Sequence, residues 1–73
     1  MINDPVIANK VSELMIETLA RLDRSTAMVM KACPQEEFKG YRRAVGAVMA
    51  EIALEILNPL YSIHPLLKPP EME

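Results

Sequence analysis

Two carboxylates at helical spacing and one imidazole are the first candidates for chemistry in this chain. Glu51 and Glu55 stand four residues apart, and His64 is the one histidine. On a helix, residues four apart lie on the same face, so the two carboxylates are placed side by side. Paired helical carboxylates bind metal ions in some helical bundles, but together with a Glu-x-x-His pair, and this sequence has none. We therefore interpret the pair as a solvated acidic face.

His64 and the single cysteine, Cys33, lack the neighbours that catalysis requires. A general base needs a nucleophile or an oriented substrate within reach, and a reactive thiol needs a base beside it. The sequence contains no Ser/His/Asp set, no glycine-rich phosphate loop and no metal-ligand spacing. We interpret His64 as a structural histidine and expect no catalytic residue, no cofactor and no metal site within one chain.

Charge and composition exclude several classes of partner. The chain has 73 residues and a formal net charge of −2, without the basic face of a nucleic-acid-binding protein. The same charge disfavours anionic membrane surfaces, and no apolar run approaches the roughly 20 residues of a membrane-spanning helix. The first residues lack the basic and apolar regions of a signal peptide. We expect a cytoplasmic protein with a reduced thiol, no nucleic-acid partner and no membrane partner.

A first helix is predicted over residues 5–32. Asn3 or Asp4 can cap it, and Pro5 suits its first position because the missing N–H would have no partner there. Neither glycine nor proline interrupts the following residues up to 32. Glu17 and Arg21 form a stabilising pair four residues apart on the polar side.

A second helix is predicted over residues 34–57, with a signal at each end. Cys33 is expected at the N-cap with Pro34 at the first helical position, and Pro59 is expected to stop the helix because it disfavours helical geometry at Asn58. Two helices of similar length joined by a short turn lie antiparallel, so the fold class is all-α, a two-helix hairpin. Residues 1–4 are a lead-in to this single domain.

The residues after the second helix, 58–73, are too proline-rich for a long helix and too apolar for an ordinary tail. Asn58 can cap one further turn that ends at His64. We expect the apolar side chains of this segment to form a strap across a helix pair, on the same subunit or on its mate; they are Leu60, Tyr61, Ile63, Leu66 and Leu67.

The chain is too apolar for a hairpin with a single internal seam. Hydrophobic residues make up 51% of the sequence, and one cysteine cannot form an internal disulfide. A core of this size supplies about 3–5 kcal/mol, so association is the expected source of further stability. We predict a four-helix bundle formed by a homo-oligomer, with a dimer as the expected state. The predicted oligomer interface consists of Phe38, Tyr41, Val45, Gly46, Met49, Ala50, Ile52, Ala53 and Leu57, in which the small residues allow close helix approach.

A second contact surface is predicted on the first helix. Ile16, Met28 and Met30 fall outside its main apolar stripe, and a monomeric hairpin would expose them. They are candidates for contacts with another protein.

Three functional hypotheses follow. The leading one is a non-enzymatic interaction module, acting as a small adaptor, regulator or assembly subunit. The alternative is a metal or small-ligand site formed only in the oligomer by Glu51, Glu55 and His64. A third is one half of an obligate hetero-complex whose partner carries the chemistry.

Overall fold

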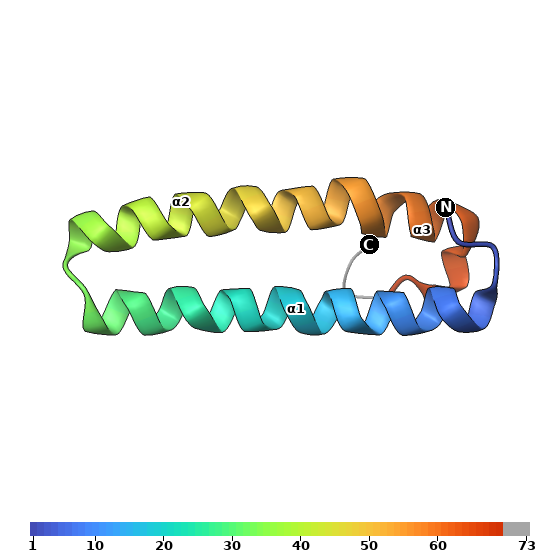
Figure 1. Cartoon of the computed structure of the whole chain (residues 1–73), viewed down its shortest axis with the longest axis horizontal. Coiled ribbons are helices and arrows are strands. Elements are labelled where there is room, and N and C mark those ends of the chain that lie inside the picture. Colours follow the sequence, from blue (N-terminus) through green and yellow to red (C-terminus); the bar gives the residue numbers. More distant parts are fainter. Residues whose placement is uncertain (70–73) are drawn as a thin grey trace.

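The computed structural model describes residues 1–69, and these residues are all-α. Helix α1 spans Pro5–Ala32 and helix α2 spans Gln35–Glu51. A π-helix, η1, spans Ile52–Leu57, and α3 spans Asn58–Ile63. A single 3₁₀ turn, η2, spans Pro65–Leu67. The two long helices run side by side in opposite directions, which fits the predicted hairpin (Figure 1).

The start of α1 follows from its capping residue, as predicted. The Asp4 carboxylate accepts hydrogen bonds from the backbone N–H groups of Val6, at 2.9 Å, and Ile7, at 3.4 Å. These two donors have no partner inside the helix, so the cap satisfies them. Pro5 occupies the first turn, where its missing N–H costs no hydrogen bond. The predicted ion pair also forms, with Arg21 Nη2 2.9 Å from Glu17 Oε1.

The turn between the long helices differs from the prediction by one position. Cys33 has extended backbone geometry and donates its N–H to the Val29 carbonyl at 2.9 Å, so it closes α1. Pro34 is the N-cap of α2, and its carbonyl accepts a hydrogen bond from the N–H of Phe38 at 3.1 Å. The expectation that Cys33 caps the second helix is therefore wrong. A proline with extended ψ serves here because the N-cap position needs a carbonyl acceptor and no N–H donor.

Pro59 does not stop the second helix, contrary to prediction. The backbone stays helical through Leu57 and Asn58, and α3 continues as far as Ile63. The six residues before Asn58 form wider π-turns, and the Asn58 N–H donates to the carbonyl of Ala53, five residues back. In a regular α-helix the Pro59 ring would collide with the carbonyl four residues earlier. The π-segment changes the backbone register just before the proline, and π-turns and prolines are both known sites of helix distortion.

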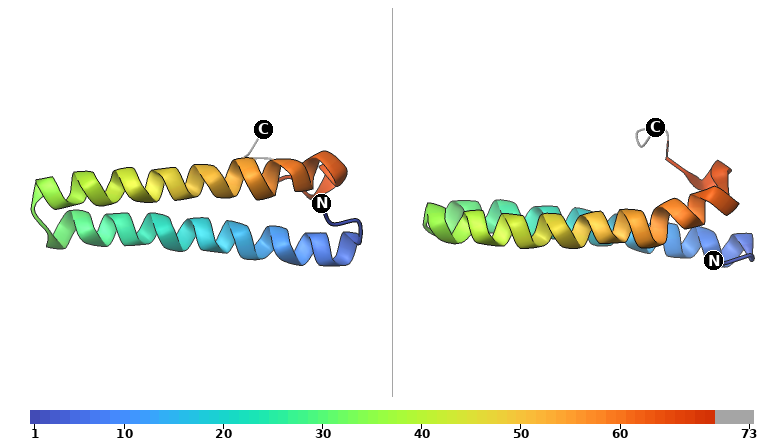
Figure 2. Two further views of the ribbon diagram at one scale, coloured as in Figure 1. Left: turned by 45° about the horizontal axis from the view of Figure 1, so that its top comes forward. Right: turned by 90° about the horizontal axis from the view of Figure 1, so that it is seen from above.

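After the π-segment the chain turns out of the plane of the two long helices (Figure 2). This brings α3 and η2 against the start of α1. Leu60 and Tyr61 are buried there, and Leu67 is half-buried, so this part of the strap packs on its own chain. Ile63 and Leu66 are 42% and 98% exposed, so the expectation that these two residues also pack in the strap fails within one chain. The predicted segment reaches residue 73, and its last four positions lie outside the described residues.

The core is small and lies mainly at one end. Among residues 1–69 the buried apolar side chains are Ala8, Val45, Leu57, Leu60 and Tyr61, and Ser12 is the buried polar residue. The Ser12 and Tyr61 hydroxyls lie 2.6 Å apart and hydrogen bond, which satisfies both in the interior. Towards the turn, the seam between α1 and α2 is only half-buried apart from Val45.

Candidate functional site

One side of the hairpin carries exposed apolar residues from both long helices. Ile7 and Leu14 on α1 are 45% and 58% exposed, and Tyr41 and Val48 on α2 are 37% and 50% exposed. Seven residues are close to two helical turns, so each pair lies along one line of its helix. The line on α1 continues through Thr18 and Ser25, and the Ser25 hydroxyl lies 2.8 Å from that of Tyr41. This bond places both lines on the same side. We call these six residues the apolar flank.

The three hydroxyl groups of the apolar flank are satisfied within the chain. Thr18 Oγ1 donates to the Leu14 carbonyl at 2.7 Å. Ser25 Oγ donates its one hydrogen to the Leu22 carbonyl at 2.6 Å, so in the 2.8 Å pair the Tyr41 hydroxyl is the donor. Because these hydroxyl donors already have hydrogen-bond partners within the chain, a second molecule can cover the surface without leaving a buried donor unpaired. The usual cost of burying polar groups is therefore avoided.

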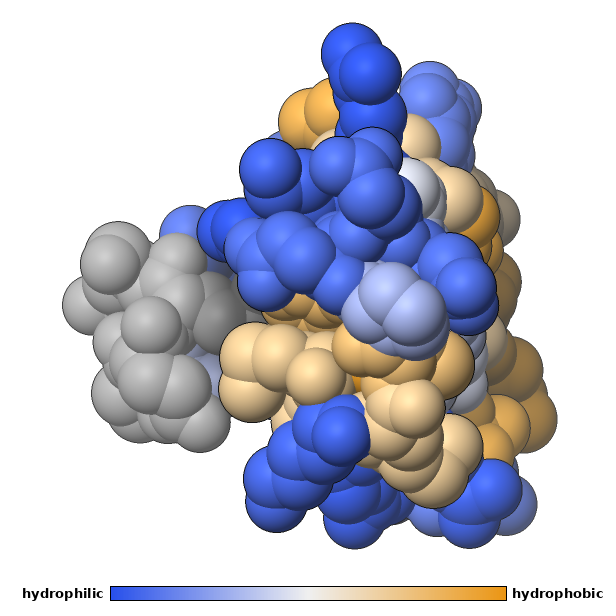
Figure 3. All heavy atoms as spheres, turned by 90° about the vertical axis from the view of Figure 1, so that its left-hand side faces the viewer, coloured by the Kyte–Doolittle hydropathy of each residue, from blue (hydrophilic) through white to orange (hydrophobic). Residues whose placement is uncertain are grey.

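The distribution of hydrophobic atoms agrees with this description. Seen along the helices from the turn, polar side chains form ridges at the outer edges of both helices (Figure 3). Hydrophobic atoms run between these ridges along the right-hand side of that view. A shallow groove of about 230 Å³ lies at the α1 edge of the apolar flank, lined by Leu14, Glu17, Thr18 and Arg21.

The opposite side of the hairpin has a different character. Lys39, Arg42 and Arg43 surround a hollow of about 280 Å³ whose floor is Gly46. A Cβ placed on Gly46 would meet no atom within 4 Å. The close helix approach predicted at Gly46 therefore has no counterpart within one chain and requires another chain.

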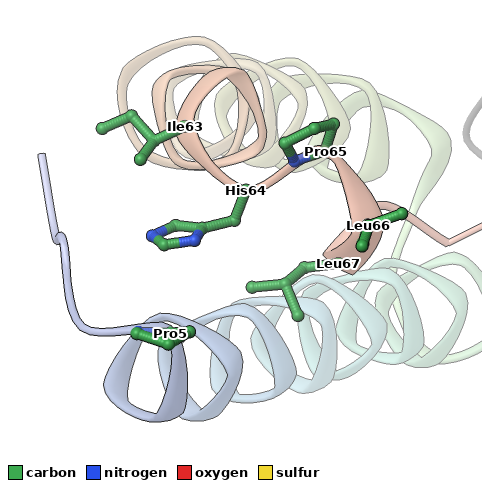
Figure 4. A pocket seen from close by; sticks show the side chains of 6 residues that line it. All are labelled: Pro5, Ile63, His64, Pro65, Leu66 and Leu67. Carbon is green, nitrogen blue, oxygen red and sulfur yellow. The ribbon is translucent and has the colours of Figure 1, made fainter.

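His64 connects the N-terminal lead-in to the end of α3. Its Nε2 lies 2.7 Å from the Ile2 carbonyl oxygen. Because a carbonyl only accepts, Nε2 carries the proton in this hydrogen bond. The ring lies beside Pro5 in an apolar hollow of about 360 Å³, between the end of α3 and the start of α1 (Figure 4). This contact gives His64 a structural task, since it ties the lead-in to the C-terminal end of the helix pair.

The predicted metal ligands are not assembled within one chain. Glu51 and Glu55 are exposed, whereas His64 is half-buried at the end of the molecule. Residues 1–69 contain no group of three His, Cys, Asp or Glu side chains that is able to hold a metal ion. A site that uses all three residues would need contributions from more than one subunit.

The residues of the predicted oligomer interface fall into two groups. Those packed at least partly against the rest of the chain are Phe38, Val45, Met49, Ile52, Ala53 and Leu57, of which Val45 and Leu57 are buried. Tyr41, Gly46 and Ala50 are exposed. Of these, Tyr41 is on the apolar flank and Gly46 is on the opposite side. Ile16, Met28 and Met30, the predicted partner surface, are 37%, 66% and 54% exposed.

From the sequence, Val48 belongs to the main apolar stripe of the second helix, and Ile7 and Leu14 lie at the edge of the stripe on the first; none of the three is predicted to line the oligomer interface. In the structure all three lie at the edges of the buried stripes, where a helical wheel of one helix cannot separate a half-buried position from an exposed one. The signal was the seven-residue spacing on both helices together with serine and tyrosine positions that can join them. This signal can be interpreted only when it is known which edge of the first helix lies beside which edge of the second.

Comparison of the chain with protein-family models, with curated proteins and with solved structures found no match. The continuous helix Gln35–Ile63 is long and apolar enough to cross a membrane, judged by length and composition alone. The core helix of a protein that does not enter membranes can pass the same test.

Proposed function

We propose that the protein is a non-enzymatic helical interaction module that acts as a homo-oligomer, with two hairpins forming a four-helix bundle. The apolar flank is its contact surface. In this role the chain is a small adaptor, regulator or assembly subunit, and its function lies in protein–protein contacts.

The observation that carries the proposal is the small core. Five apolar side chains are buried within residues 1–69, whereas large apolar side chains are exposed along both long helices. A protein of this size is marginal even with a complete core, because it buries a smaller share of its chain than a larger domain does. Burial of the apolar flank against a second chain supplies the missing apolar contact.

Mass in solution tests this proposal. Light scattering behind size exclusion, across a hundredfold dilution and with far-ultraviolet circular dichroism on the same samples, is expected to show an oligomer that loses helicity as it dissociates. A monomer that stays fully helical at every concentration would overturn the proposal. Insolubility of the chain when expressed alone would instead support the hetero-complex.

A further inference from the structure

The side of the hairpin that carries the apolar flank is large enough for a stable protein interface. The molecule measures 45 × 20 × 16 Å, so the broad side of the hairpin is 45 Å by 20 Å. This flat outline is roughly 900 Å², so the side has room for the ~800 Å² that each partner contributes to a standard interface. A second copy of the same hairpin matches this length and width.

The edges of the apolar flank carry opposite charges. On α1, Lys10 follows Ile7 by three residues and so lies just outside the flank. Arg21, seven residues after Leu14, continues the line of Ile7 and Leu14 and lines the groove at this edge. Arg21 is paired with Glu17, which leaves this edge with the net positive charge of Lys10.

On α2, the corresponding edge is acidic. Glu37 precedes Tyr41 by four residues, and Glu51 and Glu55 follow Val48 by three and seven. All three are exposed. The α1 and α2 edges run along the same part of the hairpin's length, because the Ser25–Tyr41 and Ser12–Tyr61 hydrogen bonds fix which residues of the two helices lie beside each other. Glu51 and Glu55 lie between these bonds on one helix. The Glu17–Arg21 pair lies between them on the other, and Lys10 lies just beyond Ser12.

Two symmetric arrangements bring the apolar flanks of two copies together. With the twofold axis across the helices, α2 packs on the partner's α2 and the turns lie at opposite ends. The acidic edges then meet, and the two copies of Glu51 are close because this residue lies near the middle of the helix Gln35–Ile63. With the axis along the helices, α1 packs on the partner's α2, the turns lie at the same end, and each acidic edge meets the edge that carries Lys10.

We propose that the partner on the apolar flank is a second copy placed with its turn at the same end, so that α1 of each hairpin packs against α2 of the other. This inference rests on the proposed function and adds the orientation of the two chains. The two acidic edges then no longer face each other. Each faces an α1 edge on which Glu17 and Arg21 neutralise one another and Lys10 adds one positive charge, so the like-charge contact of the other arrangement is avoided. Every helix is antiparallel to its two neighbours in both arrangements, as in up-down bundles, so the charges at the edges are what distinguishes them.

The single native cysteine makes the orientation measurable. A nitroxide label on Cys33 marks the turn, and pulsed electron paramagnetic resonance reports the distance between the two labels of a dimer. Neighbouring helices pack about 8–10 Å apart, so diagonal helices are roughly 14 Å apart and the same-end dimer gives a short distance. The opposite-end dimer gives a distance near the 45 Å length of the hairpin.

A second label site and a mass measurement keep the outcomes distinct. Ser62→Cys in a Cys33→Ser background moves the label to an exposed position at the other end of the hairpin, and a short distance is expected there too. If a label on Cys33 itself disrupts the dimer, this variant still allows the distance between the two copies to be measured. Long distances in a protein that light scattering shows to be dimeric would overturn the orientation and leave the proposed function standing. If light scattering shows that the unlabelled protein is a monomer, both the orientation and the proposed function are overturned.

Discussion

At the scale of single residues, two serine–tyrosine pairs hold the hairpin together in different surroundings. Ser12 and Tyr61 are buried, 3% and 6% exposed, and their hydroxyls lie 2.6 Å apart. Ser25 and Tyr41 form the second pair on the apolar flank, where Tyr41 is 37% exposed. The same hydrogen bond therefore stabilises the core at Ser12 and Tyr61. At Ser25 and Tyr41 it leaves an exposed surface whose hydroxyl groups already have partners and which a second molecule can bury.

The buried pair leads to a first prediction. Tyr61→Phe removes the hydroxyl that Ser12 bonds, and leaving a buried hydroxyl unpaired costs about 1–3 kcal/mol. For a chain of this length we expect Tm to fall by roughly 4–8 °C per kcal/mol, measured by circular dichroism at one fixed concentration. In the double variant with Ser12→Ala no unpaired hydroxyl remains, so its loss should be smaller than the sum of the two single losses. Strict additivity of those losses would show that the pair is not coupled.

The exposed flank leads to a second prediction. Val48→Glu places a charge at the centre of the proposed contact, and the symmetry of a dimer places it there twice. Burying each unpaired carboxylate costs at least 1–3 kcal/mol, so we expect dimerisation to weaken roughly a hundredfold or more, measured by dilution with light scattering.

The control for this variant is Leu54→Glu. Leu54 belongs to the same continuous helix and is 60% exposed, against 50% for Val48, but lies away from the apolar flank. It is expected to leave the dissociation constant within a few-fold. An equal effect of both variants would show that the loss comes from general destabilisation rather than from the flank.

At the scale of elements, the all-α class, the span of the first helix and its Asp4 cap were predictable from local sequence. Each depends on a few neighbouring residues, such as Asp4 followed by Pro5. The path past Pro59 was not predictable in this way, because local rules end a helix there. Three of the five buried apolar residues, Leu57, Leu60 and Tyr61, lie at or beyond the end of η1, so long-range packing favours continuing the helix.

The flank was harder to predict than the helices for a related reason. The sequence gives the angular position of Val48 or Leu14 on its own helix, but exposure depends on how two helices are rotated against each other. That rotation is fixed by contacts such as Ser25–Tyr41, which are distant in sequence. A pattern within one helix carries no information about it.

The π-segment leads to a third prediction. Pro59→Ala restores an N–H donor and removes the ring from the helix interior, where proline is about 3 kcal/mol less favourable than alanine. The packing of Leu60 and Tyr61 on α1 is expected to keep the π-turns in place in the variant. Because the π-segment already accommodates the proline ring, we expect only part of this difference: the free energy of unfolding should rise by roughly 1 kcal/mol, and Tm should rise with it.

Pro5→Ala is the matched control for this change. Pro5 lies in the first helical turn, where its N–H would have no helical partner, so its replacement should leave Tm nearly unchanged. A fall in Tm for Pro59→Ala alone would mean that the proline itself maintains the π-segment and the position of Tyr61.

At the scale of the whole molecule, the question is what covers the apolar surface. The hairpin is 45 Å long and buries few side chains, and the helix Gln35–Ile63 has the length and composition of a membrane span. Self-association and membrane insertion both remove apolar side chains from water, but they differ in where they place charge. In the proposed bundle Glu51 and Glu55 stay at the wet edge. In a bilayer they would lie within the hydrocarbon region, since both are in the apolar half of that helix.

This difference leads to a fourth prediction. A carboxylate at the centre of a membrane-spanning helix costs about 2.5–3.5 kcal/mol on insertion scales, and this helix would carry two. We therefore expect the protein to stay with the aqueous fraction when it is floated with neutral phosphatidylcholine vesicles, and to keep there the mass it has without lipid. Glu51→Leu with Glu55→Leu removes both charges and should shift the protein towards the vesicles. Flotation of the unaltered protein at full helicity would instead assign the apolar surface to lipid, and the bundle would lose its main support.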